Sequence, residues 1–176
     1  MSALAAETGP ETITVLVTAT QHSFMPLQEG ATAPAVSAPN QHGERVAVPV
    51  EGPTVLYFYP RDDTPGCTTE AVQFDAELGV YREAGVTVYG VSVDDVDSHR
   101  EFAEKHDIGF DLLADSDGEI ADAYGVETVS AGATRRTTIV ILDGEVHAVY
   151  EAVDPDGHAR EVLQDLLDDA VVELDG

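Results

Sequence analysis

The segment between residues 54 and 83 constrains the fold of this chain more than any other. The run Thr54-Val55-Leu56-Tyr57-Phe58-Tyr59 is apolar and rich in β-branched and aromatic residues, which is typical of a buried strand. Pro65-Gly66 then predicts a turn, and the apolar residues between Thr68 and Glu83 favour a helix. Because strands and helices also alternate further along the chain, we expect an α/β sandwich.

The only cysteine of the chain, Cys67, falls at this strand-to-helix junction. Free N–H groups and the macrodipole at a helix N-terminus favour an anion, and a thiolate is one. Thiolates lose nucleophilicity as they lose basicity, so a fast cysteine enzyme also needs donors for the oxygen that takes up charge. Thr64 can supply a hydroxyl, Gly66 a backbone N–H, and Pro60 an apolar wall. A free cysteine is often a small buried hydrophobe, but these neighbours favour a nucleophile.

The spacing Pro60-x-x-x-Thr64-x-x-Cys67 resembles the active-site signature of peroxiredoxins. The wider string YFYPRDDTPGCTTEA resembles the peroxiredoxin Q, or bacterioferritin-comigratory, branch of that family. The resemblance runs from about Leu27 to Leu167 and includes further motifs in the right order: Gly30–Pro34, Asn40–Glu44, Val88–Ser92, Ala123–Val126 and Arg136–Ile141. It implies a thioredoxin-like fold, in which helices flank a central mixed sheet.

The resemblance also implies roles for single residues. Cys67 would be the peroxidatic cysteine, and Thr64 would hydrogen-bond the peroxide and position the thiolate. Pro60 would shield the sulfur from water. Arg136 would be the distant cation that favours the thiolate and polarises the O–O bond. Arg135 lies beside it, but Arg136 directly precedes the two hydroxyl residues of the strand, as in the family.

The chain departs from its branch at one position. Many members carry a resolving cysteine five residues after the first, where this chain has Val72. The sequence therefore predicts a one-cysteine enzyme that cannot form an intramolecular disulfide. Its substrate would be hydrogen peroxide or an organic hydroperoxide, and an external thiol or a thioredoxin-like reductant would regenerate it. The resemblance implies no metal, haem or flavin.

Two functions other than peroxide reduction are alternatives for this chain. A redox sensor on the same fold would be oxidised once and would pass the signal to a partner by mixed disulfide. Sustained turnover with a thiol distinguishes the enzyme from the sensor. A holdase-like acidic chaperone is a weaker alternative, which would survive the loss of Cys67.

The net charge of the chain limits the partners and the salt conditions that we expect for it. There are 34 acidic residues against 8 basic ones, giving a net charge of −26, and Lys105 is the only lysine. Such a surface repels nucleic acid and anionic membranes, so we expect neither as a partner. Salt near 1 M shortens the Debye length to about 3 Å and removes most of the self-repulsion. We therefore expect a halophilic protein, the alternative being an ordinary acidic mesophile protein. The lone cysteine, which forms no disulfide framework, separately leads us to expect a reducing cytoplasm.

The chain divides into residues 1–24, which lie outside the resemblance, and a single peroxiredoxin-like domain over 25–176. The first 24 residues are either an extra edge strand or arm, or upstream sequence before a natural start at Met25. In this domain we expect strands at 54–59, 86–93 and 112–113 and a hairpin of 137–142 with 145–150. We expect helices at 68–83, 117–124 and 158–171. A further helix should begin at a cap, Asp97 or Ser98, and end at about His106. His99 and His106 are expected at the surface.

Overall fold

A single buried strand, β3 (Thr54–Phe58), lies at the centre of the fold, and all five of its residues are buried. The computed structural model describes residues 27–129 and 133–169. The other elements, in chain order, are β1 (Ser37–Pro39), β2 (Arg45–Ala47), α2 (Pro65–Ala76), α3 (Leu78–Glu83), β4 (Thr87–Ser92), α4 (Val96–His106), β5 (Asp111–Ala114), α5 (Glu119–Ala123), β6 (Thr137–Leu142), β7 (Glu145–Glu151) and α6 (His158–Asp168).

The main sheet has five strands in the order β5-β4-β3-β6-β7. Strands β4 and β5 run parallel to β3. Strand β6 runs antiparallel to both of its neighbours, β3 and β7, so the sheet is mixed, as expected. Phe58, the last residue of β3, pairs with Val91 on one side and with Thr137 on the other. This register places the end of β3 beside the start of β6.

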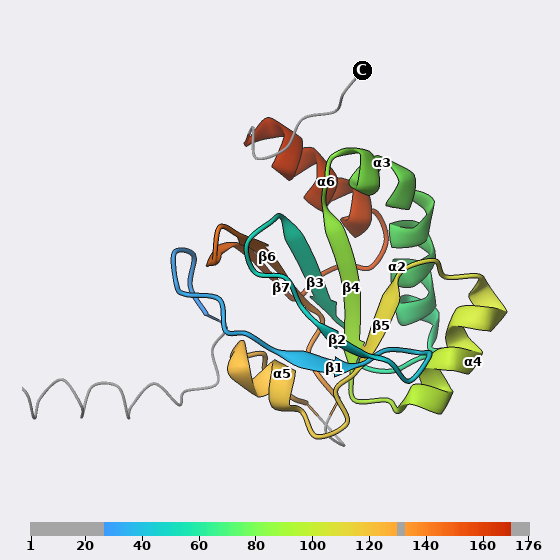
Figure 1. Cartoon of the computed structure of the whole chain (residues 1–176). Coiled ribbons are helices and arrows are strands. Elements are labelled where there is room, and N and C mark those ends of the chain that lie inside the picture. Colours follow the sequence, from blue (N-terminus) through green and yellow to red (C-terminus); the bar gives the residue numbers. More distant parts are fainter. Residues whose placement is uncertain (1–26, 130–132, 170–176) are drawn as a thin grey trace, which may run out of the picture.

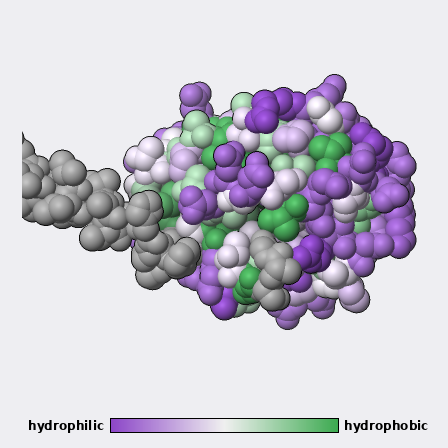
Figure 2. All heavy atoms as spheres, turned by 90° about the horizontal axis from the view of Figure 1, so that it is seen from below, coloured by the Kyte–Doolittle hydropathy of each residue, from purple (hydrophilic) through white to green (hydrophobic). Residues whose placement is uncertain are grey.

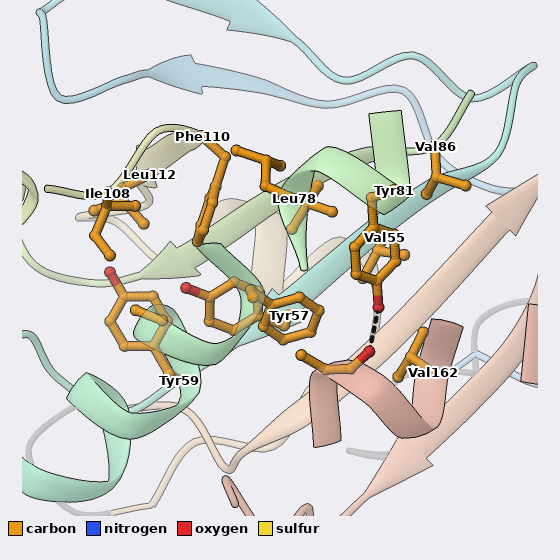
Figure 3. Close-up of a cluster of buried hydrophobic side chains, with 14 of the residues drawn as sticks. Val55, Tyr57, Tyr59, Leu78, Tyr81, Val86, Ile108, Phe110, Leu112 and Val162 are labelled. Atoms are coloured by element: carbon orange, nitrogen blue, oxygen red, sulfur yellow. Dashed lines mark hydrogen bonds between the residues drawn. The ribbon is translucent and has the colours of Figure 1, made fainter. Parts of the chain in front are cut away.

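Alternate residues of β3 serve two hydrophobic cores, one on each face of the sheet. Val55 and Tyr57 face α2, α3, α4 and α6, whereas Leu56 and Phe58 face α5 and the β1–β2 ribbon (Figure 1). On the first face, the Tyr57 ring stacks on Phe74 of α2 with centroids 4.5 Å apart. On the same face Tyr81 donates from its hydroxyl to the Ala159 carbonyl at 2.6 Å, which links α3 to α6 (Figure 3).

The long helix predicted over 68–83 begins earlier and is interrupted. It starts at Pro65, because a proline at the first helical position lacks only an N–H that the helix does not use. The Pro65-Gly66 pair is therefore the first turn of α2 and not a separate turn. Glu77 has non-helical torsions (φ −94°, ψ 1°) and divides α2 from α3.

Two expectations on α4 were wrong. The cap is Asp95, whose carboxylate accepts from Ser98 N at 2.8 Å, in place of Asp97 or Ser98. His99 is fully buried and not at the surface, because its ring nitrogens meet Asp62 and the Leu113 carbonyl inside the protein. A polar side chain with such partners is stable in an interior.

The remaining predicted elements are confirmed within a few residues. Asp143 and Gly144 both have positive φ (53° and 79°), the torsions that a two-residue hairpin between β6 and β7 requires. Helix α6 turns Val162, Leu163 and Leu166 inward. Residues 1–24 and the predicted helix end at 170–171 lie outside the described residues, so the division at residue 25 stays a prediction.

The surface is largely hydrophilic. Figure 2 shows polar side chains over most of the face seen from below, with separate hydrophobic spots between them. Among large hydrophobic residues in the described part of the chain, Val72 and Val129 are the exposed ones, at 42% and 48%. None of the helices at 27–129 or 133–169 is both long enough and apolar enough to span a bilayer.

Candidate active site

Helix α2 presents free N–H groups beside the cysteine. Thr64 is its N-cap, with extended torsions (φ −95°, ψ 154°), and the first helical hydrogen bond runs from Thr68 N to Thr64 O at 2.8 Å. Pro65 has no N–H, so the N–H groups of Gly66 and Cys67 are those left without an acceptor inside the helix. Together with the macrodipole, they make this end of α2 favourable for an anion.

The Cys67 sulfur faces a guanidinium. Arg136 Nη1 and Nη2 each lie 3.7 Å from Sγ, although the two residues are 69 positions apart in the chain. Cys67 is 1% exposed, and the Arg136 side chain is 17% exposed. Arg136 directly precedes β6, which pairs with β3 in the centre of the sheet. The sheet register thus brings the cation to the helix that follows β3.

A buried carboxylate completes this cluster. Arg136 Nη1 donates to Glu70 Oε1 at 2.8 Å, and Glu70 is fully buried on α2, one turn after Cys67. Burial raises the pKa of Glu70 from 4.5 to about 7, against the opposing attraction of Arg136. Burial alone would lower the pKa of Arg136, but the charges of Glu70 and Cys67 raise it above its ordinary value. Glu70 Oε2 is buried and has no hydrogen-bond partner among residues 27–129 and 133–169.

The glycine before the cysteine makes room for the guanidinium. A Cβ on Gly66 would lie 3.0 Å from Arg136 Nη2 and 3.5 Å from Pro155 Cγ. The first of these distances is too short for relaxed van der Waals contact. Gly66 therefore allows Arg136 to lie across the first turn of α2, and a side chain at position 66 would push the guanidinium away.

Three of the predicted site residues, Cys67, Gly66 and Arg136, lie together. Arg135 points elsewhere, since its Nε lies 3.3 Å from Glu127 Oε1. The Thr64 hydroxyl donates to the Arg61 carbonyl at 3.2 Å, and no hydrogen bond within residues 27–129 and 133–169 joins it to the sulfur. Pro60 follows β3 and is half-buried. The roles of Thr64 and Pro60 toward a substrate stay predictions.

Glu70 is a site residue that the sequence predictions missed, although its helical spacing carries a signal. Buried positions on α2 are 67, 70, 71 and 74, the i, i+3, i+4, i+7 stripe of a helix that packs on a core. Glu70 occupies this stripe, whereas the apolar Val72 lies outside it. An acid at an inward position predicts a buried partner of opposite charge.

Comparison with known proteins assigns the family. The AhpC/TSA family profile matches residues 30–149. This chain belongs to the AhpC/TSA family of peroxiredoxins. It is 37% identical over 148 residues to the putative peroxiredoxin Bcp of Coxiella burnetii, an alignment that covers 79% of this chain and 98% of the relative.

Solved peroxiredoxins have the same fold. Peroxidoxin BcpB from Mycobacterium tuberculosis superposes with a TM-score of 0.74 at 33% identity, covering 82% of this chain and 97% of that one. The bacterioferritin comigratory protein of Xanthomonas campestris, whose structures address its alkyl peroxide reduction activity, superposes with a TM-score of 0.73 at 30% identity, covering 81% and 99%. The expected thioredoxin-like fold and the peroxiredoxin Q branch are confirmed. This peroxiredoxin has a single cysteine.

Proposed function

We propose that this peroxiredoxin reduces hydrogen peroxide or an organic hydroperoxide through Cys67 and is regenerated by a thiol from outside the chain. The observation that carries the proposal is the contact of both Arg136 Nη atoms with Cys67 Sγ at 3.7 Å. A guanidinium at this place favours a thiolate and supplies donors for a developing oxyanion. The N–H groups of Gly66 and Cys67 add to both effects.

In the proposed reaction, the Cys67 thiolate attacks the terminal oxygen of the hydroperoxide. An S–O bond forms as the O–O bond breaks, the sulfur is oxidised to sulfenic acid, and the leaving oxygen takes up a proton as water or an alcohol. Arg136 stabilises the charge on the oxygens. Thr64 keeps donating to the Arg61 carbonyl and accepts the peroxide O–H with its free lone pair. Pro60 keeps water from the sulfur.

Regeneration requires two further thiol groups. The first attacks the sulfenic sulfur, which releases water and leaves a mixed disulfide with Cys67. The second attacks that mixed disulfide, frees the Cys67 thiolate and leaves the reductant oxidised to a disulfide. Because Cys67 is the only cysteine of the chain, both thiols come from a small molecule or from a thioredoxin-like protein.

One relative suggests which organic substrate to test. The Xanthomonas campestris protein is described by its alkyl peroxide reduction activity. An alkyl hydroperoxide is therefore the organic substrate to test beside hydrogen peroxide.

Peroxide consumption in the presence of a dithiol tests the proposal. We expect steady turnover by the wild-type protein and none by Cys67→Ser. Val72→Ala is the matched control, because Val72 lies on the same helix but is 42% exposed, and it should keep the wild-type rate. Full turnover by Cys67→Ser would exclude the mechanism.

A redox sensor is the second candidate, and the single cysteine favours it. A sensor would be oxidised once and would keep its oxidised form until a specific protein thiol reacted with it. The same assay separates the two functions. Many peroxide molecules consumed per Cys67 indicate the enzyme, whereas one per Cys67 with both small thiols and thioredoxin indicates the sensor.

A further inference from the structure

The loop 60–64 connects β3 to α2 and carries two of the proposed site residues. Pro60 begins the loop and Thr64 ends it, so its conformation sets where both lie relative to Cys67. Asp62 lies in the middle of the loop, yet its side chain is only 4% exposed. A loop carboxylate is buried at such a position only if strong partners hold it.

Asp62 has such partners. Its Oδ1 accepts from the Tyr59 hydroxyl at 2.7 Å, and its Oδ2 accepts from Ser98 Oγ at 2.8 Å. His99 Nδ1 lies 2.7 Å from the same Oδ2. The backbone N–H of Asp62 also donates to Asp94 Oδ2 at 2.7 Å. The carboxylate is thus the point at which the loop is fastened to α4.

His99 connects this carboxylate to the sheet. The ring is fully buried, and its Nε2 lies 3.0 Å from the Leu113 carbonyl in β5. A carbonyl oxygen can only accept, so Nε2 carries a hydrogen. On the other side of the ring, Nδ1 lies at hydrogen-bond distance from Asp62 Oδ2. His99 therefore bridges the loop to β5 with one hydrogen bond at each ring nitrogen.

We propose that His99 is a positioning residue for peroxide reduction, which acts through Asp62 on the loop that carries Pro60 and Thr64. The inference rests on the proposed peroxidase function. Losing the bond at His99 Nδ1 would leave Ser98 as the α4 residue that holds the Asp62 carboxyl group, and this weaker attachment would let the Thr64 hydroxyl shift. A misplacement of about 1 Å costs about 100-fold in a reaction that depends on orientation.

The neighbouring residue offers a matched control. Asp63 lies on the same loop and pairs with Lys105 of the same helix at 3.0 Å, but both side chains are more than half exposed. Exposed ion pairs contribute little to stability. Lys105→Met should therefore leave the peroxide reaction unchanged, although it also removes a contact between the loop and α4.

Two substitutions of His99 separate its two bonds. In His99→Asn the amide nitrogen takes the place of Nδ1 and keeps the bond to Asp62. In His99→Gln it takes the place of Nε2 and keeps only the bond to Leu113. We expect His99→Gln to lose about 100-fold in the second-order rate with peroxide, and His99→Asn to keep most of that rate. Rapid mixing, quenching and mass spectrometry of Cys67 measure it.

The second half-reaction is an internal control. Attack of a thiol on the sulfenic sulfur does not use the hydroxyl of Thr64, so its rate should be the same in His99→Gln and in the wild-type protein. A purely structural role for His99 would instead lower both rates, and would lower them in proportion to the loss of thermal stability in both variants. Equal peroxide rates for His99→Gln and wild type would also overturn the proposal.

Further measurements cover two other outcomes. If His99→Gln does not fold, two other variants weaken the attachment of the loop to α4. Ser98→Ala removes the second bond to Asp62 Oδ2, Asp62→Asn changes the carboxylate itself, and both should show the same selective loss in the peroxide rate. If the wild-type protein does not consume peroxide, the proposed function fails, but the effect of His99 on the loop 60–64 can still be measured. Amide hydrogen exchange over 60–64 should then be faster in His99→Gln than in His99→Asn, and equal exchange would refute it.

Discussion

Replacing Glu70 by glutamine tests the electrostatics of the cluster around Cys67. Burial raises the pKa of Glu70 from 4.5 to about 7, so the folded protein keeps this proton at pH values where the unfolded chain releases it. Between these two values the folded state binds more protons, and stability falls as pH rises. The contribution of Glu70 is therefore fully present below pH 4.5 and is lost as pH rises through about 7.

The magnitude follows from the two pKa values. A difference of about 2.5 between the two pKa values, at about 1.4 kcal/mol for each pKa unit, corresponds to about 3 to 4 kcal/mol over the whole titration. Glutamine keeps an acceptor for Arg136 Nη1 but has no proton to lose. The stability of Glu70→Gln relative to the wild-type protein should therefore be about 3 kcal/mol higher at about pH 8 than at about pH 4.

Urea unfolding at the two pH values measures this difference. Circular dichroism is the suitable signal because the chain contains no tryptophan. About 1 M salt suppresses the repulsion among the other acids. Glu83→Gln is the matched control: it removes the same charge from an exposed position at the end of α3. If Glu70→Gln shows no more pH dependence than Glu83→Gln, the raised pKa of Glu70 is refuted.

Three further predictions address the guanidinium, the glycine and the surface charge. Arg136→Lys replaces a planar guanidinium that contacts both Cys67 and Glu70 by a single ammonium group. This change should slow peroxide reduction about 100-fold or more, whereas Arg135→Lys should leave the rate unchanged. Gly66→Ala should lower the peroxide rate about tenfold by displacing Arg136, and should lower the melting temperature because the displaced guanidinium leaves the buried Glu70; unchanged kinetics would contradict the close contact. If the expectation of a halophilic protein is correct, the melting temperature should rise between about 0.1 M and about 2 M salt, and equal values at both would contradict that expectation.

Local patterns in the sequence were sufficient to predict the strands of the main sheet and the place of the cysteine at a helix start, whereas the mixed sheet was implied by the family resemblance. The run at 54–59 is apolar at every position because β3 is covered on both faces, and such a run is distinctive. The interruption at Glu77 was not predictable in this way, because the apolar residues continue on both sides of it. Helix periodicity alone does not distinguish one helix from two that follow closely.

The buried polar residues were harder to predict because their partners are distant in the chain. Glu70 is buried against Arg136, and His99 is buried between Asp62 and Leu113. A sequence pattern gives the residue type but not the partner, so His99 was expected at the surface and Glu70 was given no role. The expected place of Arg136 beside Cys67 implies a place for Glu70 as well, since Glu70 follows Cys67 by one helical turn.

The pairing of Phe58 with Thr137 has a consequence for engineering. Arg136 directly precedes β6, and Cys67 lies in the first turn of the helix that follows β3, so hydrogen bonds between two neighbouring backbones bring the two groups to the same end of the sheet. The chain segment between α3 and β6 is not part of this pairing. Insertions in its surface turns should leave the chemistry intact, whereas a slip of one residue between β3 and β6 would turn Arg136 to the opposite face and inactivate a protein that still folds.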